Sequence, residues 1–138
     1  MTGWTFADVW EAIAARAPSQ PALIQGDWVV SWAEFDHHAD ALARAFLNAG
    51  MGQQAKVAAF LYNGPEYLET YFAAFKVGMA PVNTNYRYGS DELYYLFDNA
   101  DAEAVFNSCG MSAEESTAYH LVNVNAWRVA LRGCHHAG

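Results

Sequence analysis

Short apolar stretches separated by polar turns predict alternating helices and strands over the first 107 residues. At the beginning, Thr5 and Asp8 can cap a helix that runs to about Ala17, and Pro18 and Pro21 stop it. The apolar positions within this stretch recur at helical spacing. The chain is therefore expected to open with an amphipathic helix.

A tight hairpin and a longer helix are predicted next. The strands Ala22–Gln25 and Trp28–Ser31 flank Gly26-Asp27, an order that suits a turn whose first central residue needs a positive φ. Ser31 and Glu34 form the capping box of a helix that ends at Gly50. Apolar residues at helical spacing predict one buried stripe on that helix: Phe35, Ala39, Leu42 and Phe46.

The almost wholly apolar run Lys56–Tyr62 predicts a strand that is covered on both faces. Asn63-Gly64-Pro65 follows it, and Pro65 suits the first position of a helix that stops at Gly78. Large apolar residues are expected to share one side of this helix: Tyr67, Leu68, Tyr71, Phe72 and Phe75.

Three further elements complete the pattern. Ala80–Val82 is a short strand, Ser90 caps a helix over Asp91–Asn99, and Ala102–Phe106 is another strand. Strand, helix, strand, helix and strand joined by short loops predict an α/β fold. We expect a partial parallel sheet with right-handed crossover helices.

Composition and charge exclude several classes of function. A chain of 138 residues that is 54% hydrophobic fits one domain with a packed core. Its net charge of −8 argues against binding to nucleic acid and to anionic lipid, both of which need basic surfaces. No apolar run is long enough for a transmembrane span, and the beginning does not resemble a signal peptide. A cytoplasmic location is expected.

The charge and the cysteines divide the chain at about Asn107. Residues 1–107 contain thirteen of the fifteen acidic residues and five of the seven basic ones, so they carry the whole net charge. Residues 108–138 contain both cysteines and three of the five histidines, and show no sustained helical or strand period. We expect 1–107 to be one truncated domain and 108–138 to be an unrelated tail that is disordered or frame-shifted.

Three motifs carry a resemblance to a known family. They are VSWAEF at Val30–Phe35, FKVGMAPVNTNYRY at Phe75–Tyr88 and DELYYLFDNADAEAVF at Asp91–Phe106. In unbroken order over residues 4–107, the chain resembles the beginning of the AMP-forming acyl-CoA synthetases of the fatty-acid–CoA ligase type, in the adenylate-forming ligase superfamily. The resemblance implies an incomplete N-terminal subdomain of that fold.

The resemblance also implies a chemistry that this chain cannot complete. The family makes an acyl-adenylate from a carboxylic acid and Mg-ATP, releases pyrophosphate, and transfers the acyl group to coenzyme A. Its Ser/Thr/Gly-rich phosphate loop does not occur here, and its later catalytic motifs lie further downstream in the family. We expect no catalytic, cofactor-binding or metal-binding residue in this chain, and no ligase activity of the chain alone.

A non-catalytic module is the alternative. Such a module would pair with a full-length synthetase or with a separately encoded remainder. An incomplete parallel sheet leaves a strand edge exposed, through which the chain could also self-associate. ATP, Mg, coenzyme A and the fatty acid would then be bound only by the complete enzyme.

Two loops within the chain are candidate ligand contacts. Asn63-Gly64-Pro65 could present backbone amides to an anion, but its single glycine and Pro65 favour a simple helix start. The Asn83–Tyr88 turn follows a parallel strand, at the edge where open α/β sheets bind ligands. Arg87 could face a carboxylate or phosphate there, although a salt bridge with a nearby acidic residue is the favoured interpretation.

Metal sites and nucleophiles are not indicated. His37 and His38 are adjacent on a predicted helix, so they point to different faces and cannot form a metal-binding pair. The serines and cysteines lack the surroundings of a nucleophile elbow. The last part of the chain contains metal-ligating residue types at spacings that match no zinc motif: Cys109, His120, Cys134, His135 and His136.

Overall fold

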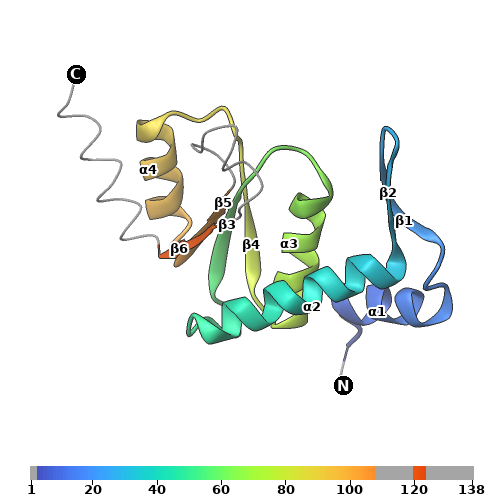
Figure 1. The fold of residues 1–138 in the computed structure, drawn as a ribbon. Coiled ribbons are helices and arrows are strands. Elements are labelled where there is room, and N and C mark those ends of the chain that lie inside the picture. Colours follow the sequence, from blue (N-terminus) through green and yellow to red (C-terminus); the bar gives the residue numbers. More distant parts are fainter. Residues whose placement is uncertain (1–2, 108–119, 124–138) are drawn as a thin grey trace. The chain divides into compact units, whose positions relative to one another are not determined.

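The computed structural model of the chain describes residues 3–107 and 120–123 (Figure 1). The chain forms two compact units, and it passes between them more than once. We call residues 3–54 and 63–79 the helical unit. The sheet unit comprises residues 55–62, 80–107 and 120–123.

The helical unit contains three helices and a hairpin: α1 (Phe6–Arg16), β1 (Pro21–Gln25), β2 (Trp28–Ser31), α2 (Trp32–Asn48) and α3 (Pro65–Lys76). Both predicted capping boxes are present at the beginnings of α1 and α2. The Asp8 backbone N–H donates to Thr5 Oγ1 at 3.2 Å, and the Glu34 N–H donates to Ser31 Oγ at 3.3 Å. Each cap satisfies an amide that the helix itself leaves unpaired.

The hairpin follows the sequence prediction closely. Its strands are antiparallel, with Ile24 opposite Val29 and Gln25 opposite Trp28. Gly26 occupies the turn with φ of +59°, a conformation that costs a glycine little. The Gly26-Asp27 turn is thereby confirmed.

Aromatic rings form the centre of the helical unit. The ring of Trp10 lies 5.6 Å from that of Phe35 and 5.2 Å from that of Phe72, and the Phe35 and Phe72 rings are 4.9 Å apart. These three residues belong to α1, α2 and α3, so the cluster joins all three helices. Aromatic pairs at such distances add to the free energy gained by burial alone.

The predicted stripe on α2 is confirmed at three of its four positions, since Phe35, Ala39 and Phe46 are fully buried and Leu42 is partly buried. On α3, the predicted residue Phe72 is fully buried and Leu68 is 40% exposed. Smaller residues share the buried positions with Phe72: Thr70, Ala73 and Ala74. Small side chains allow α3 to pack closely on α2, its main neighbour within the unit.

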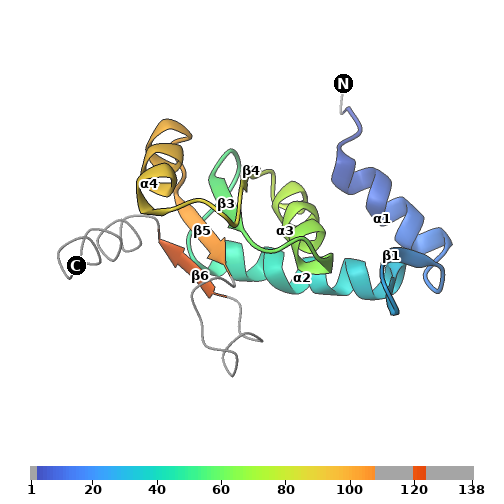
Figure 2. The ribbon, with the colours of Figure 1, turned by 90° about the horizontal axis from the view of Figure 1, so that it is seen from above.

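The sheet unit contains β3 (Lys56–Phe60), β4 (Ala80–Thr84), α4 (Ser90–Asn99), β5 (Ala104–Asn107) and β6 (His120–Asn123). The strand order is β4-β3-β5-β6, with β3 parallel to both β4 and β5. These pairings confirm the α/β class and the partial parallel sheet. The strand β6, which runs antiparallel beside β5 (Figure 2), was not predicted.

Helix α4 covers part of this sheet with aliphatic and aromatic side chains. Leu93 and Phe97 pack with Ala58, Phe60 and Val105 in one buried cluster. The strands contribute Phe60 as well as small and β-branched residues, and α4 contributes Leu93 and Phe97. The cluster thus joins α4 to the sheet through large side chains from both.

Several predicted boundaries were wrong by one or two residues. The strand expected over Lys56–Tyr62 ends at Phe60, and the strand expected over Ala102–Phe106 runs over Ala104–Asn107. Gly89 caps α4 in place of Ser90, because the Gly89 backbone N–H donates to Glu92 Oε2 at 2.8 Å. Strand β4 runs on to Thr84, since Asn83 and Thr84 pair with β3 although their side chains are polar. Pairing with β3 thus outweighed the preference of these two polar residues for a turn.

The predicted tail lies almost wholly outside the described residues. Only His120–Asn123 is described within residues 108–138, and the boundary at Asn107 stays a prediction. In the described parts of the chain, no helix combines the length and the apolar character that crossing a membrane requires.

Candidate functional site

The carboxyl ends of three parallel strands meet at one edge of the sheet unit. Phe60 on β3 is in register with Thr84 on β4 and with Asn107 on β5. Thr84 and Asn107 are both buried, and Thr84 Oγ1 donates to the Val82 carbonyl at 3.2 Å. Open α/β sheets bind their ligands at this kind of edge, which makes it the candidate site.

A well-defined turn follows β4 at this edge. Asn85 Oδ1 accepts a hydrogen bond from the Arg87 backbone N–H at 3.0 Å, and the Tyr88 N–H donates to the Asn85 carbonyl at 3.0 Å. Asparagine stabilises turns by this kind of bond to its own backbone. The turn predicted at Asn83–Tyr88 therefore exists, but it begins at Asn85. It fixes the backbone of Tyr86 and Arg87.

Tyr62, Tyr86 and Arg87 form what we call the arginine corner. The two tyrosine rings are 5.0 Å apart, and Arg87 Nε donates to Tyr86 Oη at 3.0 Å. The guanidinium carbon also lies 5.4 Å from the Tyr86 ring. Among the described residues Arg87 forms no ion pair with a carboxylate, so the salt bridge stays a prediction.

The chemistry of the arginine corner suits a ligand that has an anionic group and a flat ring. A guanidinium presents several N–H donors in a plane, which matches the geometry of phosphate and carboxylate groups. Tyr62 is 60% exposed, so part of its side chain is open to solvent. Such a ring can stack against a flat apolar surface.

The beginning of α3, the other candidate loop, lacks the features of a phosphate cradle. Gly64 is the N-cap residue in an extended conformation, and Pro65 has no backbone N–H to donate. The Glu66 carboxylate folds back so closely that a Cβ on Gly64 would stand 2.7 Å from Glu66 Oε2. An anion already occupies this helix terminus, which supports the interpretation as a helix start.

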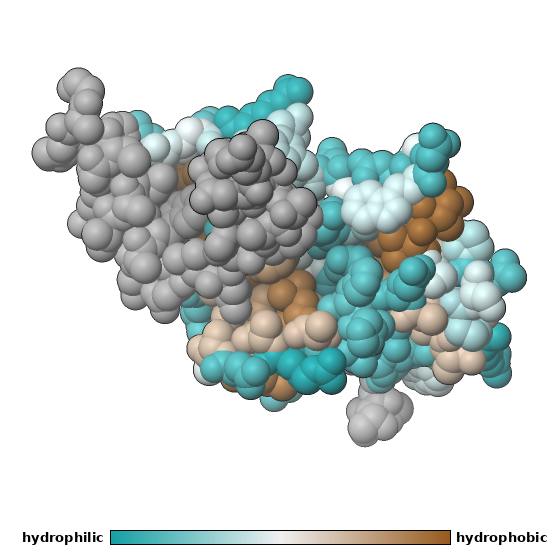
Figure 3. All heavy atoms as spheres, in the orientation of Figure 1, coloured by the Kyte–Doolittle hydropathy of each residue, from teal (hydrophilic) through white to brown (hydrophobic). Residues whose placement is uncertain are grey.

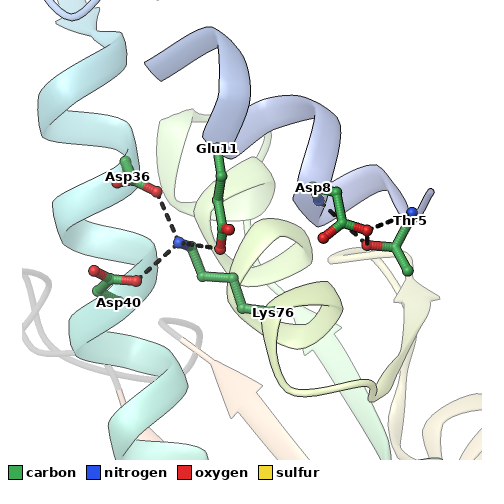
Figure 4. A network of polar contacts seen from close by, with 6 residues as sticks. All are labelled: Thr5, Asp8, Glu11, Asp36, Asp40 and Lys76. Atoms are coloured by element: carbon green, nitrogen blue, oxygen red, sulfur yellow. Dashed lines mark hydrogen bonds and ion pairs between the residues drawn. The ribbon is translucent and has the colours of Figure 1, made fainter. Parts of the chain in front are cut away.

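A buried lysine, which the sequence analysis missed, links the three helices of the helical unit (Figure 4). Lys76 Nζ lies 2.8 Å from Glu11 Oε1, 2.7 Å from Asp36 Oδ1 and 2.8 Å from Asp40 Oδ1. Its side chain is only 9% exposed and lies over the Phe72 ring. In the sequence, Lys76 is a charged residue within the apolar run around Phe75 and Val77. Charged residues are rarely buried unless they are paired, so this position could have indicated a buried ion pair.

The environment of Lys76 stabilises its charged form. Burial alone would lower the pKa of Lys76, but hydrogen bonds to Asp36, Asp40 and Glu11 outweigh it and raise the pKa well above its usual value. A lysine that is held protonated cannot act as a base at neutral pH. The Lys76 cluster is therefore structural.

His37 and His38, the two histidines whose side chains are described, do not form a metal site with each other. His38 Nδ1 lies 2.7 Å from Glu69 Oε1, so it links α2 to α3, whereas His37 is exposed. Within residues 3–107 no group of three or more potential ligands of the His, Cys, Asp or Glu type could hold a metal ion. Of the predicted tail residues, Cys109, Cys134, His135 and His136 lie outside the described residues, and only the backbone of His120 is described.

Comparison with known proteins gives a consistent family. A family model described as AMP-binding enzyme matches residues 10–134. A ligase of Mycobacterium marinum, named medium/long-chain-fatty-acid–CoA/3-oxocholest-4-en-26-oate–CoA ligase, is 34% identical over 72% of this chain and 18% of its own length. The 2,3-dihydroxybenzoate-AMP ligase of Bacillus subtilis is 34% identical over 74% of this chain and 19% of its own length.

The fold agrees with solved structures as well. The N-terminal domain of FACL13 from Mycobacterium tuberculosis superposes with a TM-score of 0.72 and 19% identity. That superposition covers 76% of this chain and 27% of the FACL13 chain. The chain thus spans less than a fifth of the length of the two relatives and about a quarter of the solved domain.

Proposed function

The chain belongs to the AMP-binding enzyme family, and on that premise we propose that it supplies the first part of the N-terminal subdomain of a fatty-acid–CoA ligase. The complete enzyme would convert ATP, a carboxylic acid and coenzyme A to acyl-CoA, AMP and pyrophosphate. The observation that carries the proposal is the identity of 34% along 72% of the chain to a ligase named for these substrates.

Between residues 3 and 107 no set of residues fits Mg-ATP. The N-terminus of α3 has Pro65 in place of a donor and the Glu66 carboxylate beside it. A triphosphate needs several backbone donors, a lysine and a metal held by oxygen ligands. We therefore propose that the chain on its own binds no Mg-ATP, coenzyme A or metal, supplies no catalytic residue and has no ligase activity.

The arginine corner is the part of the chain that we expect to face ligand in the complete enzyme. It lies at the ligand-binding edge of the sheet, and Arg87 has no carboxylate partner among the described residues. Its role would be to orient an anionic group of a nucleotide-bearing ligand, either ATP or coenzyme A. A contact that is made equally in the bound ground state and in the transition state lowers KM and leaves kcat unchanged.

The alternative is a non-catalytic module that pairs with a full-length ligase. Exposed apolar side chains on the hairpin, Ile24 at 68% and Val29 at 51%, favour an interaction role of this kind. Self-association through the outer edge of β4 would be a second consequence of an incomplete sheet. In both versions the chain acts in the cytoplasm.

Complementation tests the proposal. A form of the M. marinum ligase that lacks the segment matching this chain would be assayed for acyl-CoA formation with decanoate, ATP and coenzyme A. We expect activity only when the purified chain is added, with the relative's own segment as the positive control. If the chain leaves the shortened ligase inactive but changes the activity of the intact ligase, the module alternative is correct.

A further inference from the structure

Asn63 is the single asparagine of the chain that precedes a glycine. It is exposed and lies with Gly64 in the bend between β3 and α3, outside every described helix and strand. Both residues line a surface depression of about 330 Å³, so water reaches them. Within residues 3–107 no group hydrogen-bonds to the Asn63 side-chain amide, and the Gly64 backbone N–H has no acceptor. Both groups are therefore open to a reaction with each other.

An asparagine–glycine pair of this kind can lose ammonia without an enzyme. The Gly64 backbone nitrogen attacks Cγ of Asn63, and a new N–Cγ bond forms. The bond from Cγ to the side-chain nitrogen breaks, and ammonia leaves with a proton that passes from the Gly64 N–H through solvent. Water then opens the cyclic succinimide at either carbonyl carbon, which gives aspartate or isoaspartate. Glycine favours the attack, because it has no Cβ beside the nitrogen.

Gln25, the last residue of β1, restrains the peptide group that contains the attacking nitrogen. Gln25 Nε2 donates to the Asn63 carbonyl at 2.9 Å. This carbonyl and the Gly64 nitrogen belong to one planar peptide, so holding the oxygen also fixes the direction of the nitrogen. The closed ring holds the asparagine at a ψ angle outside the common helix and strand regions. The peptide plane must therefore rotate before closure, and the hydrogen bond from Gln25 must break.

The restraint by Gln25 is exposed to solvent. Gln25 comes directly before the Gly26-Asp27 turn, and its side chain is exposed. Figure 3 shows mainly hydrophilic surface at this tip of the hairpin. Water can therefore compete for the hydrogen bond, so the bond slows the rotation of the peptide plane and does not prevent it.

We propose that Asn63 is a site of spontaneous deamidation and that the hydrogen bond from Gln25 sets the rate. The reaction consumes only solvent water, so it proceeds in the chain alone. Aspartate at this position brings a second carboxylate to the beginning of α3, where the Glu66 carboxylate already lies beside Gly64. Isoaspartate also inserts a carbon atom into the main chain. The modification thus changes both the charge and the backbone where the chain enters α3.

Peptide mapping by mass spectrometry tests the site in the full chain. The purified chain would be incubated at mildly alkaline pH, and conversion of Asn63 to the acid would be compared with that of Asn48 in the same sample. Asn48 is also exposed, but it ends α2 and precedes Ala49. We expect conversion of Asn63 while Asn48 stays an amide. An enzyme that methylates isoaspartate identifies the second product.

Two variants separate the ring closure from the restraint. Gly64→Ala adds a Cβ beside the attacking nitrogen, and conversion should fall to the level of Asn48. Alanine fits this extended backbone, with φ of −169°, once the Glu66 side chain moves. Gln25→Met keeps the length of the side chain and removes the donor. Conversion should then be roughly fivefold faster, the factor that corresponds to one neutral hydrogen bond.

Persistence of the Asn63 amide for as long as that of Asn48 would overturn the proposed site. Equal rates in the wild type and in Gly64→Ala would overturn the reaction through a succinimide. Equal rates in the wild type and in Gln25→Met would overturn the role of Gln25. Circular dichroism before and after incubation checks that the wild type and both variants stay folded.

Discussion

The helical unit is held together by aromatic rings and by a lysine paired with three carboxylates, whereas the sheet unit combines a parallel ladder with a cluster of aliphatic residues and the rings of Phe60 and Phe97. In the helical unit the ring of Trp10 packs against those of Phe35 and Phe72, and Lys76 lies over the Phe72 ring. In the sheet unit Phe97 packs on strand residues as small as Ala58. The first unit pairs its lysine with three carboxylates of its own, and the second has Arg87 at the edge where we propose that ligand is contacted. The two units therefore differ in how they use their charged residues.

The largest effect is expected from the aromatic core. Phe72→Ala removes a ring that is fully buried between Trp10 and Phe35, and should lower the free energy of unfolding by about 3–5 kcal/mol. Phe97→Ala in the sheet unit should cost a similar amount. Only Phe72→Ala should change the native tryptophan fluorescence, because Trp10 contacts Phe72. Urea unfolding measures both effects, and a fluorescence change of equal size in the two variants would contradict the comparison.

Removal of the buried ammonium group should have the next largest effect. Lys76→Met leaves three carboxylates close together without their cation, and we expect a loss of about 2–3 kcal/mol at pH 8. Lys56→Met is the control, because Lys56 Nζ lies 3.7 Å from Asp101 Oδ2 in an exposed ion pair. This variant should lower the free energy of unfolding by less than about 0.5 kcal/mol.

Alkaline titration sharpens the same prediction. In the folded chain the pKa of Lys76 is raised above its ordinary value of 10.5. The contribution of Lys76 to the free energy of unfolding is therefore fully present below pH 10.5 and is lost as the pH rises through the pKa of the folded state. The difference in unfolding free energy between wild type and Lys76→Met should therefore shrink above that pH. A constant difference would show that the hydrogen bonds to the ammonium group are not its source.

An effect on binding is expected at the arginine corner. In the complemented enzyme, Arg87→Gln should raise the KM for ATP or for coenzyme A roughly tenfold and leave kcat within about twofold, because a charged hydrogen bond to ligand is lost. Stability should change little, since Arg87 is exposed. Unchanged KM values for both substrates would remove the arginine corner from the ligand site.

The smallest effects are expected at the helix caps. Ser31→Ala removes the cap of α2 and should cost about 1 kcal/mol, whereas Ser90→Ala should cost almost nothing because Gly89 caps α4. Hydrogen bonds from the Ser31 backbone and hydroxyl hold the pKa of Glu34 below its ordinary value of 4.5. The contribution of Glu34 to the free energy of unfolding is therefore present above pH 4.5 and is lost as the pH falls through the lowered pKa of the folded state. Thermal unfolding at pH 7 and pH 3 measures these differences, and equal costs for the two serine variants would reverse the assignment of the caps.

Sequence reasoning succeeded where the physical cause is local. The caps at Thr5 and Ser31 and the turn at Gly26 depend on residues within three positions of each other, and the structure confirms all of them. The parallel strands could also be predicted, because a continuous apolar run such as Lys56–Phe60 needs cover on both faces.

The remaining features depend on residues that are far apart in the sequence. Lys76 meets Glu11 and Asp36 only after three helices have packed, so no spacing along the chain indicates that cluster. Strand β4 continues through Thr84 because β3 offers pairing partners, although Asn83 and Thr84 favour a turn. Arg87 was expected to find an acidic partner, and among the described residues the turn directs it to Tyr86.

We propose that the chain has part of the fold of AMP-forming ligases and no adenylating activity of its own. Exchange of labelled pyrophosphate into ATP, measured with the purified chain in the presence of magnesium and either decanoate or 2,3-dihydroxybenzoate, tests this claim directly. We predict no exchange above that of buffer. Acid-dependent exchange that disappears in the Phe72→Ala variant would contradict the claim, because it would show that the folded chain itself forms an adenylate.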